Sequence, residues 1–441
     1  MHFQKRLASG LTVVGERMPH LRSVSVGLWV NAGSLHERPE ENGISHFIEH
    51  MDFQGTARRS ARDIADEMDG VGGNLNAFTA KDCTCFYATV VDEHLPLALD
   101  ILFDMVFHPS LPEDEMEKEK MVVGEEIAMV EDTPEELSGD LLAEAYFGSH
   151  PLGQPILGPE ENVAAFTRAQ VLDYMNRFYQ PGNMVLSIVG HFSIQQLDQL
   201  LETQLSLVQG IHEADPVEWT LEDTCTGRIV RTRPVEQVHL NLALPGLPRQ
   251  DPLNHSLVVL NNLLGGGMSS RLFQRIREVR GLAYSVYSYP YSYQHCGVMS
   301  IYAGLNGENL QETLEVTLDE LDQLRMGRFT EGEFARSREQ MKGNYILGLD
   351  SPSNRMMGMG KGMLLYQRIH TETEVLRRIN RVTRESVQAA AQRLLQPEAM
   401  AVAIVGPGDV NYEGILQAVG IGCRPPAERI APLAAGNRPG A

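Results

Sequence analysis

Cysteine is scarce in this sequence. Five cysteines are spread over 441 residues, and no two of them form a C-x-x-C pair. This usage argues against a disulfide framework and against a cysteine-based zinc site. We therefore interpret Cys83 and Cys85, the closest pair, as reduced packing residues.

The chain also lacks an excess of basic residues and any long apolar run. It has 37 Lys and Arg against 58 Asp and Glu, a formal net charge of −21. Nucleic-acid binders need a basic surface, so no nucleic-acid partner is expected. No run is long enough to cross a membrane, and the first residues lack the apolar core of a secretory signal. We expect no membrane partner and a cytoplasmic location.

What the chain does have is a short motif of metal-binding residues. Residues 43–51 read GISHFIEHM, in which His46 and His50 are four apart and Glu49 lies between them. In a helix, residues i and i+4 share one face, so two imidazoles can hold one ion beside a carboxylate. The order H-x-x-E-H is the inverse of the H-E-x-x-H zinc helix and occurs among metallopeptidases. Because the sequence contains 14 histidines, such a short motif needs a third ligand to support it.

Two distant segments of the chain align without a gap. Residues 167–190 (TRAQVLDYMNRFYQPGNMVLSIVG) match residues 383–406 (TRESVQAAAQRLLQPEAMAVAIVG), each typical of a helix, a Gln-Pro turn and a buried strand. Upstream, VSVGLWV at 24–30 parallels VHLNLAL at 238–244. This period is far longer than a solenoid repeat, so it indicates duplicated domains.

The predicted fold is α+β, with two duplicated α/β halves, each a mostly antiparallel sheet packed with helices. We place an N-terminal metal-binding catalytic domain at residues 1–212, a homologous domain without metal at 222–428, and a flexible tail at 429–441. Only the first half carries the histidine motif, because the second has LVVLNNLL (257–264) at the comparable place. That asymmetry favours a functional role for the histidines.

The order of elements in the first half can also be predicted. Alternating patterns indicate strands at 11–17, 22–31, 74–79 and 83–91, with a turn at Pro19 between the first two. Helices are expected around the metal motif and at about 60–70, 93–107 and 112–131. The last of these is acidic. Glu119 and Glu126 lie seven apart on one face of it, and spacing alone does not choose between Glu125 and Glu126 as a third ligand.

Taken together, several motifs resemble the pitrilysin–insulysin family of zinc metallopeptidases, in the branch of mitochondrial processing peptidase and its bacterial relatives. The resemblance is carried by HFIEH (46–50), Gly55-Thr56, Asn76-Ala77-Phe78-Thr79 and Glu119 with EEI (125–127), and it covers nearly the whole chain. It implies that His46, His50 and Glu126 bind Zn²⁺, that Glu49 is the general base, and that Glu119 assists. Asn76, Ala77 and Phe78 resemble the edge strand that binds the substrate by β-augmentation.

The second half has a signature of its own, a glycine-rich segment at 264–272 followed by REVRGLAY (277–284). In the family, an Arg and a Tyr at the spacing of Arg277 and Tyr284 reach the substrate carbonyl, where they can stabilise an oxyanion. Arg275 and Arg280 are alternatives to Arg277. One departure from the family pattern is Asp52, at a position that is usually apolar; its carboxylate either approaches the metal ligands or faces water.

The resemblance implies a zinc-dependent endopeptidase that hydrolyses peptides or unfolded segments in a chamber. Full-length relatives have four such domains and this chain has two, so a homodimer is expected, or a heterodimer with a paralogue. The acidity of the chain favours basic peptides if the charge lines the chamber. The alternative function is a non-catalytic scaffold subunit, like the core proteins of respiratory complexes, whose metal motif is usually broken.

Overall fold

The computed structural model describes residues 2–214, 219–221, 224 and 226–421. Two compact units make up the chain, and neither is continuous in sequence. Unit 1 comprises Met1–Ala128, Pro155–Glu218 and Ile346–His370, and unit 2 comprises Met129–Gln154, Trp219–Tyr345 and Thr371–Ala441. The predicted tail at 429–441 lies outside the described residues. Within the part of the chain that is described, no helix combines the length and apolarity that crossing a bilayer requires.

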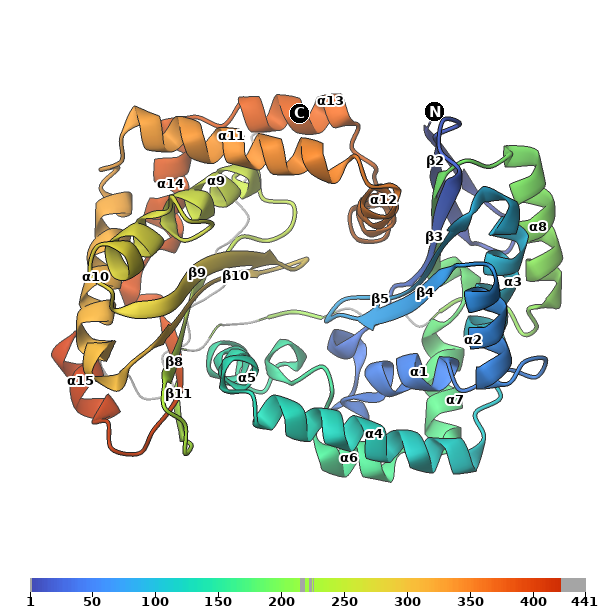
Figure 1. Ribbon diagram of the computed structural model, residues 1–441, viewed down its shortest axis with the longest axis horizontal. Helices are drawn as coiled ribbons and strands as arrows, with labels where there is room; N and C mark the ends of the chain where they lie inside the picture. The colour runs from blue at the N-terminus through green and yellow to red at the C-terminus, as the bar shows by residue number, and fades with distance from the viewer. Residues whose placement is uncertain (1, 215–218, 222–223, 225, 422–441) are drawn as a thin grey trace. The chain divides into compact units, whose positions relative to one another are not determined.

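Unit 1 is built on a six-stranded sheet of order β1-β2-β6-β3-β5-β4 (Figure 1). Its strands are β1 (His2–Arg6), β2 (Thr12–Arg17), β3 (Ser23–Val30), β4 (Asn74–Thr79), β5 (Thr84–Val91) and β6 (Met184–Gly190). All pairs are antiparallel except β2 with β6. The two strands expected on either side of Pro19 are β2 and β3, but they do not form a hairpin, because β6 lies between them.

Both faces of this sheet pack against apolar side chains. Alternate residues of a strand point to opposite sides, so one strand can contribute to a core on each face. Along β3, Val24, Val26 and Leu28 belong to one apolar core, and Trp29 belongs to another on the opposite face. Helix α3 (Leu95–Phe107) packs on β5 and β3. The remaining helices of the unit are α1 (Ile44–Asp52), α2 (Ala61–Gly70), most of α4 (Glu113–Glu131), α6 (Glu160–Ala165), α7 (Arg168–Phe178), α8 (Ile194–Leu207) and α12 (Pro352–Tyr366).

Unit 2 repeats this topology without a counterpart of β1. Its five-stranded sheet has the order β7-β11-β8-β10-β9, and only β7 with β11 is parallel. The strands are β7 (Arg228–Thr232), β8 (Val238–Pro245), β9 (Ala283–Ser292), β10 (Gly297–Leu305) and β11 (Ala401–Gly406). Its helices are α5 (Pro134–Phe147), α9 (Asn254–Leu264), α10 (Leu310–Arg325), most of α11 (Glu331–Gly348), α13 (Glu372–Asn380), α14 (Arg384–Leu394) and α15 (Tyr412–Ala418), with a π-helix at Phe273–Glu278. The predicted α+β fold of two related, mostly antiparallel halves is confirmed.

The aligned segments of the sequence form equivalent elements. Helix α7 precedes β6, and α14 precedes β11, as the duplication predicts. Each helix begins at a threonine, Thr167 or Thr383, whose hydroxyl accepts a hydrogen bond from a backbone N–H three residues on. Such a cap satisfies one of the free donors at a helix start.

Each half of the sequence contributes a helix to the other compact unit. Helix α12, from the second half, packs on β6, β3 and β2 of unit 1. Helix α5, from the first half, packs on β11, β8 and β7 of unit 2. The compact units therefore differ from the continuous segments 1–212 and 222–428 by this reciprocal exchange.

Candidate metal centre

Helix α1 carries the histidine motif, and its start is fixed by a buried carboxylate. Glu37 accepts hydrogen bonds from the backbone N–H groups of Gly43 (2.9 Å) and Ser45 (2.8 Å). A negative charge at a helix N-terminus is favourable, because free N–H groups point toward it. Gly43 has φ of +101°, and a Cβ there would lie 2.5 Å from the carbonyl oxygen of Leu157. The backbone conformation and this close contact thus require glycine at the start of the helix.

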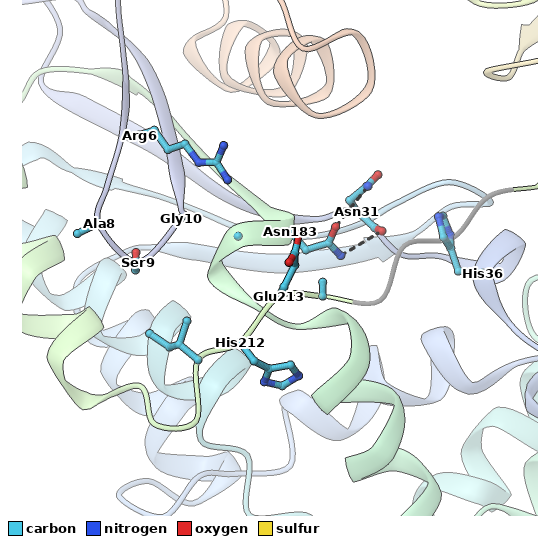
Figure 2. Close-up of a pocket in the computed structure, with 12 residues that line it drawn as sticks. Arg6, Ala8, Ser9, Gly10, Asn31, His36, Asn183, His212 and Glu213 are labelled. Carbon is cyan, nitrogen blue, oxygen red and sulfur yellow. Dashed lines mark hydrogen bonds between the residues drawn. The ribbon is translucent and has the colours of Figure 1, made fainter.

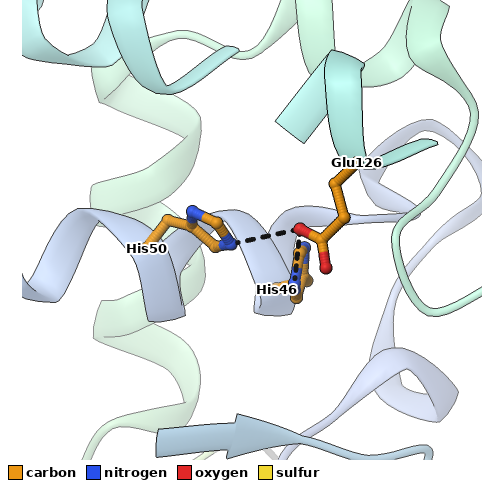
Figure 3. A group of neighbouring side chains, drawn as sticks. All are labelled: His46, His50 and Glu126. Atoms are coloured by element: carbon orange, nitrogen blue, oxygen red, sulfur yellow. Dashed lines mark ion pairs between the residues drawn. The ribbon is translucent and has the colours of Figure 1, made fainter. Parts of the chain in front are cut away.

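The structure brings His46, His50 and Glu126 together. Glu126 Oε2 lies 3.6 Å from His46 Nε2 and 3.5 Å from His50 Nε2. Figure 3 shows both imidazoles projecting from α1 toward the carboxylate of Glu126 on α4. Among the described residues, this is the group of His, Cys, Asp and Glu side chains placed to hold a metal ion, and Glu125 is not part of it. Glu125 is exposed to solvent instead.

This donor set fits zinc. Two imidazole nitrogens and one carboxylate oxygen are the ligands of many catalytic zinc sites. Bonds of about 2.1 Å in a tetrahedral site place neighbouring ligand atoms about 3.4 Å apart, close to the spacing observed. Burial and the nearby His50 lower the pKa of His46 to about 4. His46 is therefore neutral at physiological pH, as a metal ligand must be.

A second carboxylate orients one of the imidazoles. His50 Nδ1 lies 3.1 Å from Glu119 Oε2, and the amide of Gln54 donates to Glu119 Oε1 at 2.7 Å. A hydrogen bond from Nδ1 would fix the ring so that Nε2 can face a bound metal. Glu119 thus contacts His50 of the candidate centre, and its assisting role stays a prediction. Sequence reasoning missed Gln54, because only the tertiary structure brings it to Glu119.

Glu49 lies on the same helix, and its carboxylate is held by a neighbouring strand. Thr79, the last residue of β4, donates its hydroxyl to Glu49 Oε2 at 2.6 Å. Burial raises the pKa of Glu49, and the Thr79 hydrogen bond opposes this shift. The sequence motif contained Thr79, but its contact with Glu49 was not predicted.

Strand β4 forms an edge of the sheet in unit 1, so one side of its backbone is unpaired within that sheet. Ala77 is buried in the core below the strand, whereas Asn76 is exposed. The ring of Phe78 packs edge-on against Trp29, with 5.7 Å between centroids. The three predicted substrate-binding residues therefore lie on an edge strand that also contacts the helix of the metal motif.

Asp52 neither touches the metal ligands nor faces water. Its side chain is fully buried, and neither carboxylate oxygen has a hydrogen-bond partner. Burial, with the negative charge of Glu49 nearby, raises the pKa of Asp52 well above its usual value. The carboxyl group is therefore held in its neutral form over a wider pH range than an exposed aspartate.

Arg277 and Tyr284 lie in unit 2, next to each other. The Arg277 guanidinium stacks over the rings of Phe273 (4.8 Å) and Tyr284 (5.2 Å), and Tyr284 is 76% exposed. Arg277 belongs to a π-helix, a feature that is frequent at functional sites. All three candidate arginines pair with carboxylates. Arg275 lies 2.6 Å or less from Asp319 and Glu320, and Arg280 lies 2.6 Å from Glu312, all on α10, whereas the contact of Arg277 with Glu278 is longer, at 3.8 Å. Arg277 is thus held by the weakest ion pair of the three, and its role at a substrate stays a prediction.

Unit 1 also has a surface hollow of about 510 Å³ that contains none of the predicted site residues. Arg6, Asn31, His36 and His212 are among the residues that line it, as Figure 2 shows. Asn31 and Asn183, which both line it, hydrogen-bond to each other. We place the functional centre at the converging metal-binding side chains, because chemistry depends on donor groups rather than on volume.

Comparison with known proteins defines the class. The family described as "Insulinase (Peptidase family M16)" matches residues 12–160, and "Peptidase M16 inactive domain" matches residues 165–341. A Bacillus subtilis protein named an uncharacterized zinc protease, YmxG, is 43% identical over 401 residues, which cover 90% of this chain and 97% of that protein. A zinc protease of the same description from Mycobacterium tuberculosis is 40% identical over 404 residues, 91% of this chain and 92% of its own. The chain belongs to the M16 peptidase family.

Solved structures support the same fold. A peptidase M16 inactive domain from Pseudomonas fluorescens matches with a TM-score of 0.86 at 22% identity, covering 93% of this chain and 99% of its own. A protease from Helicobacter pylori matches equally well, with a TM-score of 0.86 over 92% of this chain and 99% of its own. At this level of identity, the likeness concerns the fold alone.

Proposed function

We propose that this chain is a zinc-dependent endopeptidase. The observation that carries the proposal is the convergence of His46, His50 and Glu126, with the carboxylate of Glu49 on the same helix face. The metal-binding motif is complete, and relatives over nine-tenths of the chain are named zinc proteases. Hydrolysis of a peptide bond by such a site needs a metal, a base and a way to hold an extended chain.

His46, His50 and Glu126 would hold the ion, which when bound supplies polarisation of a carbonyl oxygen and acidification of a water molecule. Glu49 takes the proton of the attacking water and returns it to the leaving amine. Burial suits Glu49 to this role, because it raises the pKa of the carboxylate and so makes it a stronger base.

Substrate would bind along β4. An extended peptide can add a strand to an exposed sheet edge, where backbone hydrogen bonds give affinity without demanding one sequence. Asn76, Ala77 and Phe78 occupy this edge beside the helix of the metal motif. We infer that the enzyme acts on peptides and unfolded segments, which can adopt an extended form.

The active assembly would be a homodimer, with a heterodimer as the alternative. Relatives of the insulysin type enclose a chamber with four domains, and this chain supplies two. Arg277 and Tyr284 of one chain would then stabilise the oxyanion at the partner's metal centre. The net charge of −21 favours basic peptides if acidic groups line the chamber.

Replacing Glu49 tests the enzyme against the scaffold alternative. Glu49→Gln should keep its zinc, because Glu49 is not in the ligand group, and should lose hydrolysis of a quenched basic peptide. Glu126→Gln should lose zinc, whereas the neighbouring Glu125→Gln should keep both zinc and activity. A parent protein that binds zinc but shows no chelator-sensitive cleavage would support the non-catalytic scaffold.

A further inference from the structure

Thr79 joins the strand that would bind substrate to the residue that would act as the base. Its hydroxyl donates to Glu49 Oε2 at 2.6 Å. The same hydroxyl lies 3.5 Å from the carbonyl oxygen of Ser45, a much longer contact. A hydroxyl has one proton to donate, so the short contact to the carboxylate takes it.

The direction of the Thr79 side chain follows from the strand pattern. Residues two apart in a strand share a face, so Thr79 lies on the face of Ala77, which is buried in the core below β4. Phe78, between them, points to the other face and packs on Trp29. Thr79 can therefore reach α1 from a strand that forms the edge of its sheet.

Among the described residues, Glu49 accepts no side-chain hydrogen bond other than that of Thr79. The backbone of Thr79 also hydrogen-bonds to Glu49, with a smaller effect on its pKa than the hydroxyl has. A glutamate side chain has three rotatable bonds, and a short hydrogen bond from the hydroxyl to an anionic oxygen removes much of that freedom. Holding Oε2 leaves Oε1 to accept the proton of a water molecule. The orientation of the base would otherwise depend on a flexible side chain.

We propose that Thr79 is a positioning residue that sets the carboxylate of Glu49 for proton transfer and ties its position to β4. This inference rests on the proposed function, because it assigns Glu49 the role of base. Thr79 itself touches neither the metal ligands nor the reacting atoms. Its effect should therefore appear in the chemical step rather than in metal or substrate binding.

Thr79→Val removes the hydroxyl and keeps the branched shape. We expect kcat to fall about 10- to 100-fold, as for other groups that orient catalytic residues, with KM within about twofold and zinc content unchanged. Thr79→Ser keeps the hydroxyl and should recover most of the activity. The matched control is Thr89→Val on β5 in the same sheet. It removes a hydroxyl that is hydrogen-bonded to the Ser25 hydroxyl, with 2.9 Å between the two oxygens.

Cobalt(II) in place of zinc gives a readout that needs no turnover. The visible absorption of the cobalt protein should change alike in Thr79→Val and Glu49→Gln, and should match the parent in Thr79→Ser and Thr89→Val. A parent-like spectrum and kcat in Thr79→Val would overturn the inference, as would a Thr79→Ser variant as impaired as Thr79→Val. In those cases the parent still cleaves and Glu49→Gln does not. If the parent itself fails to cleave, the proposed function fails and the role of Thr79 falls with it.

Discussion

The two histidines of the metal centre are held in different ways. His50 has a carboxylate, Glu119, against its Nδ1, whereas Nδ1 of His46 is buried without a hydrogen-bond partner. A carboxylate behind a ligating imidazole fixes the ring and makes its other nitrogen a better ligand. The affinity of the site for zinc should therefore depend strongly on the hydrogen bond between His50 and Glu119.

Glu119→Gln should weaken zinc binding about 10- to 100-fold, because the amide is a poorer acceptor for the Nδ1 proton. Competition with a chromogenic chelator measures this affinity directly. Glu117→Gln, on the exposed side of the same helix, is the matched control and should bind zinc as the parent does. Equal affinities in the two variants would show that Glu119 does not support His50.

Asp52 provides a prediction about stability and pH. Because burial raises the pKa of Asp52 in the folded protein, the folded state binds its proton more tightly than the unfolded state does. This group therefore costs stability as pH rises from its unfolded pKa, about 4, through its higher folded pKa. Asp52→Asn lacks that titration, so it should be more stable than the parent at pH 8, by about 1 kcal/mol or more, with the difference shrinking toward pH 4.

Urea denaturation of the metal-free protein at several pH values measures this difference. Asp69→Asn, at an exposed position on α2, is the control and should show little change at any pH. If Asp52→Asn instead loses stability relative to the parent as pH rises, the folded state favours the charged carboxylate, contrary to the structure. A difference that does not change with pH would mean that folding leaves the pKa of Asp52 unchanged, which also contradicts it.

Sequence reasoning located the side chains that converge in the candidate metal centre but not the residues that contact them. His46, His50 and Glu49 could be predicted because helical spacing alone puts them on one face. Glu125 and Glu126 are adjacent on α4, so helical spacing could not show which of them faces the histidines. The structure places Glu126 beside both imidazoles and leaves Glu125 exposed. Thr79 and Gln54 were not predicted as partners, since 30 and 65 residues separate them from the groups they contact.

For the helices, too, some features could be predicted from the sequence and others could not. Their existence followed from periodicity and caps, and the duplication predicted that α7 and α14 would be equivalent. The exchange of α5 and α12 between compact units was not predicted. An apolar face reports that a helix is buried but does not report which of two similar sheets buries it. The fit between the side chains of the helix and those of the sheet decides this, and it is seen only in the folded structure.

Helix α12 contains a test of that packing. A Cβ at Gly360 would lie 2.0 Å from Trp29 Nε1 on β3, whereas a Cβ at Gly358 would meet no atom within 4 Å. Gly358→Ala should therefore stabilise the protein by up to about 1 kcal/mol, through helix propensity. Gly360→Ala should destabilise it by about 1–3 kcal/mol, because the close contact must open.

Thermal and urea unfolding of the two variants compare the same chemical change at two sites of one helix. Opposite signs are expected. If Gly360→Ala also stabilises the protein, α12 does not pack against Trp29 in solution, and its assignment to unit 1 is wrong.

At the scale of the whole molecule, the duplication explains why one chain carries both a candidate metal centre and a related unit without one. The five strands of unit 2 follow the same order as β2-β6-β3-β5-β4 of unit 1, and the parallel pair is the equivalent one in each sheet. In unit 2, α9 is apolar, with buried leucines and asparagines, and contributes no ligand to the metal group of the described residues. The sequence predicted this relation because both copies kept the helix–turn–strand segment. The sequence did not determine which surfaces meet in an assembly, since that depends on complementarity between surfaces far apart in the chain.

Mixing two inactive variants tests the proposed sharing of sites across a dimer. A Glu49→Gln chain lacks the base but keeps Tyr284, and a Tyr284→Phe chain lacks the phenol but keeps the base. If Tyr284 serves the partner's metal centre, a mixed dimer contains one site with both groups intact and one with neither. Half of the dimers in an equal, fully exchanged mixture are mixed, so about a quarter of the parental activity should return.

The control replaces the second chain by His46→Ala, which has an intact Tyr284 but a damaged metal centre. No arrangement of this chain with Glu49→Gln yields a complete site, so this mixture should stay inactive. Recovery in the first mixture only would therefore require the base and Tyr284 to come from different chains. No recovery, with subunit exchange shown by tagged chains, would mean that each chain works alone or that Tyr284 does not act at the metal centre. A Tyr284→Phe chain that is fully active by itself would show that Tyr284 does not act at the metal centre, because the phenol would then be dispensable for hydrolysis.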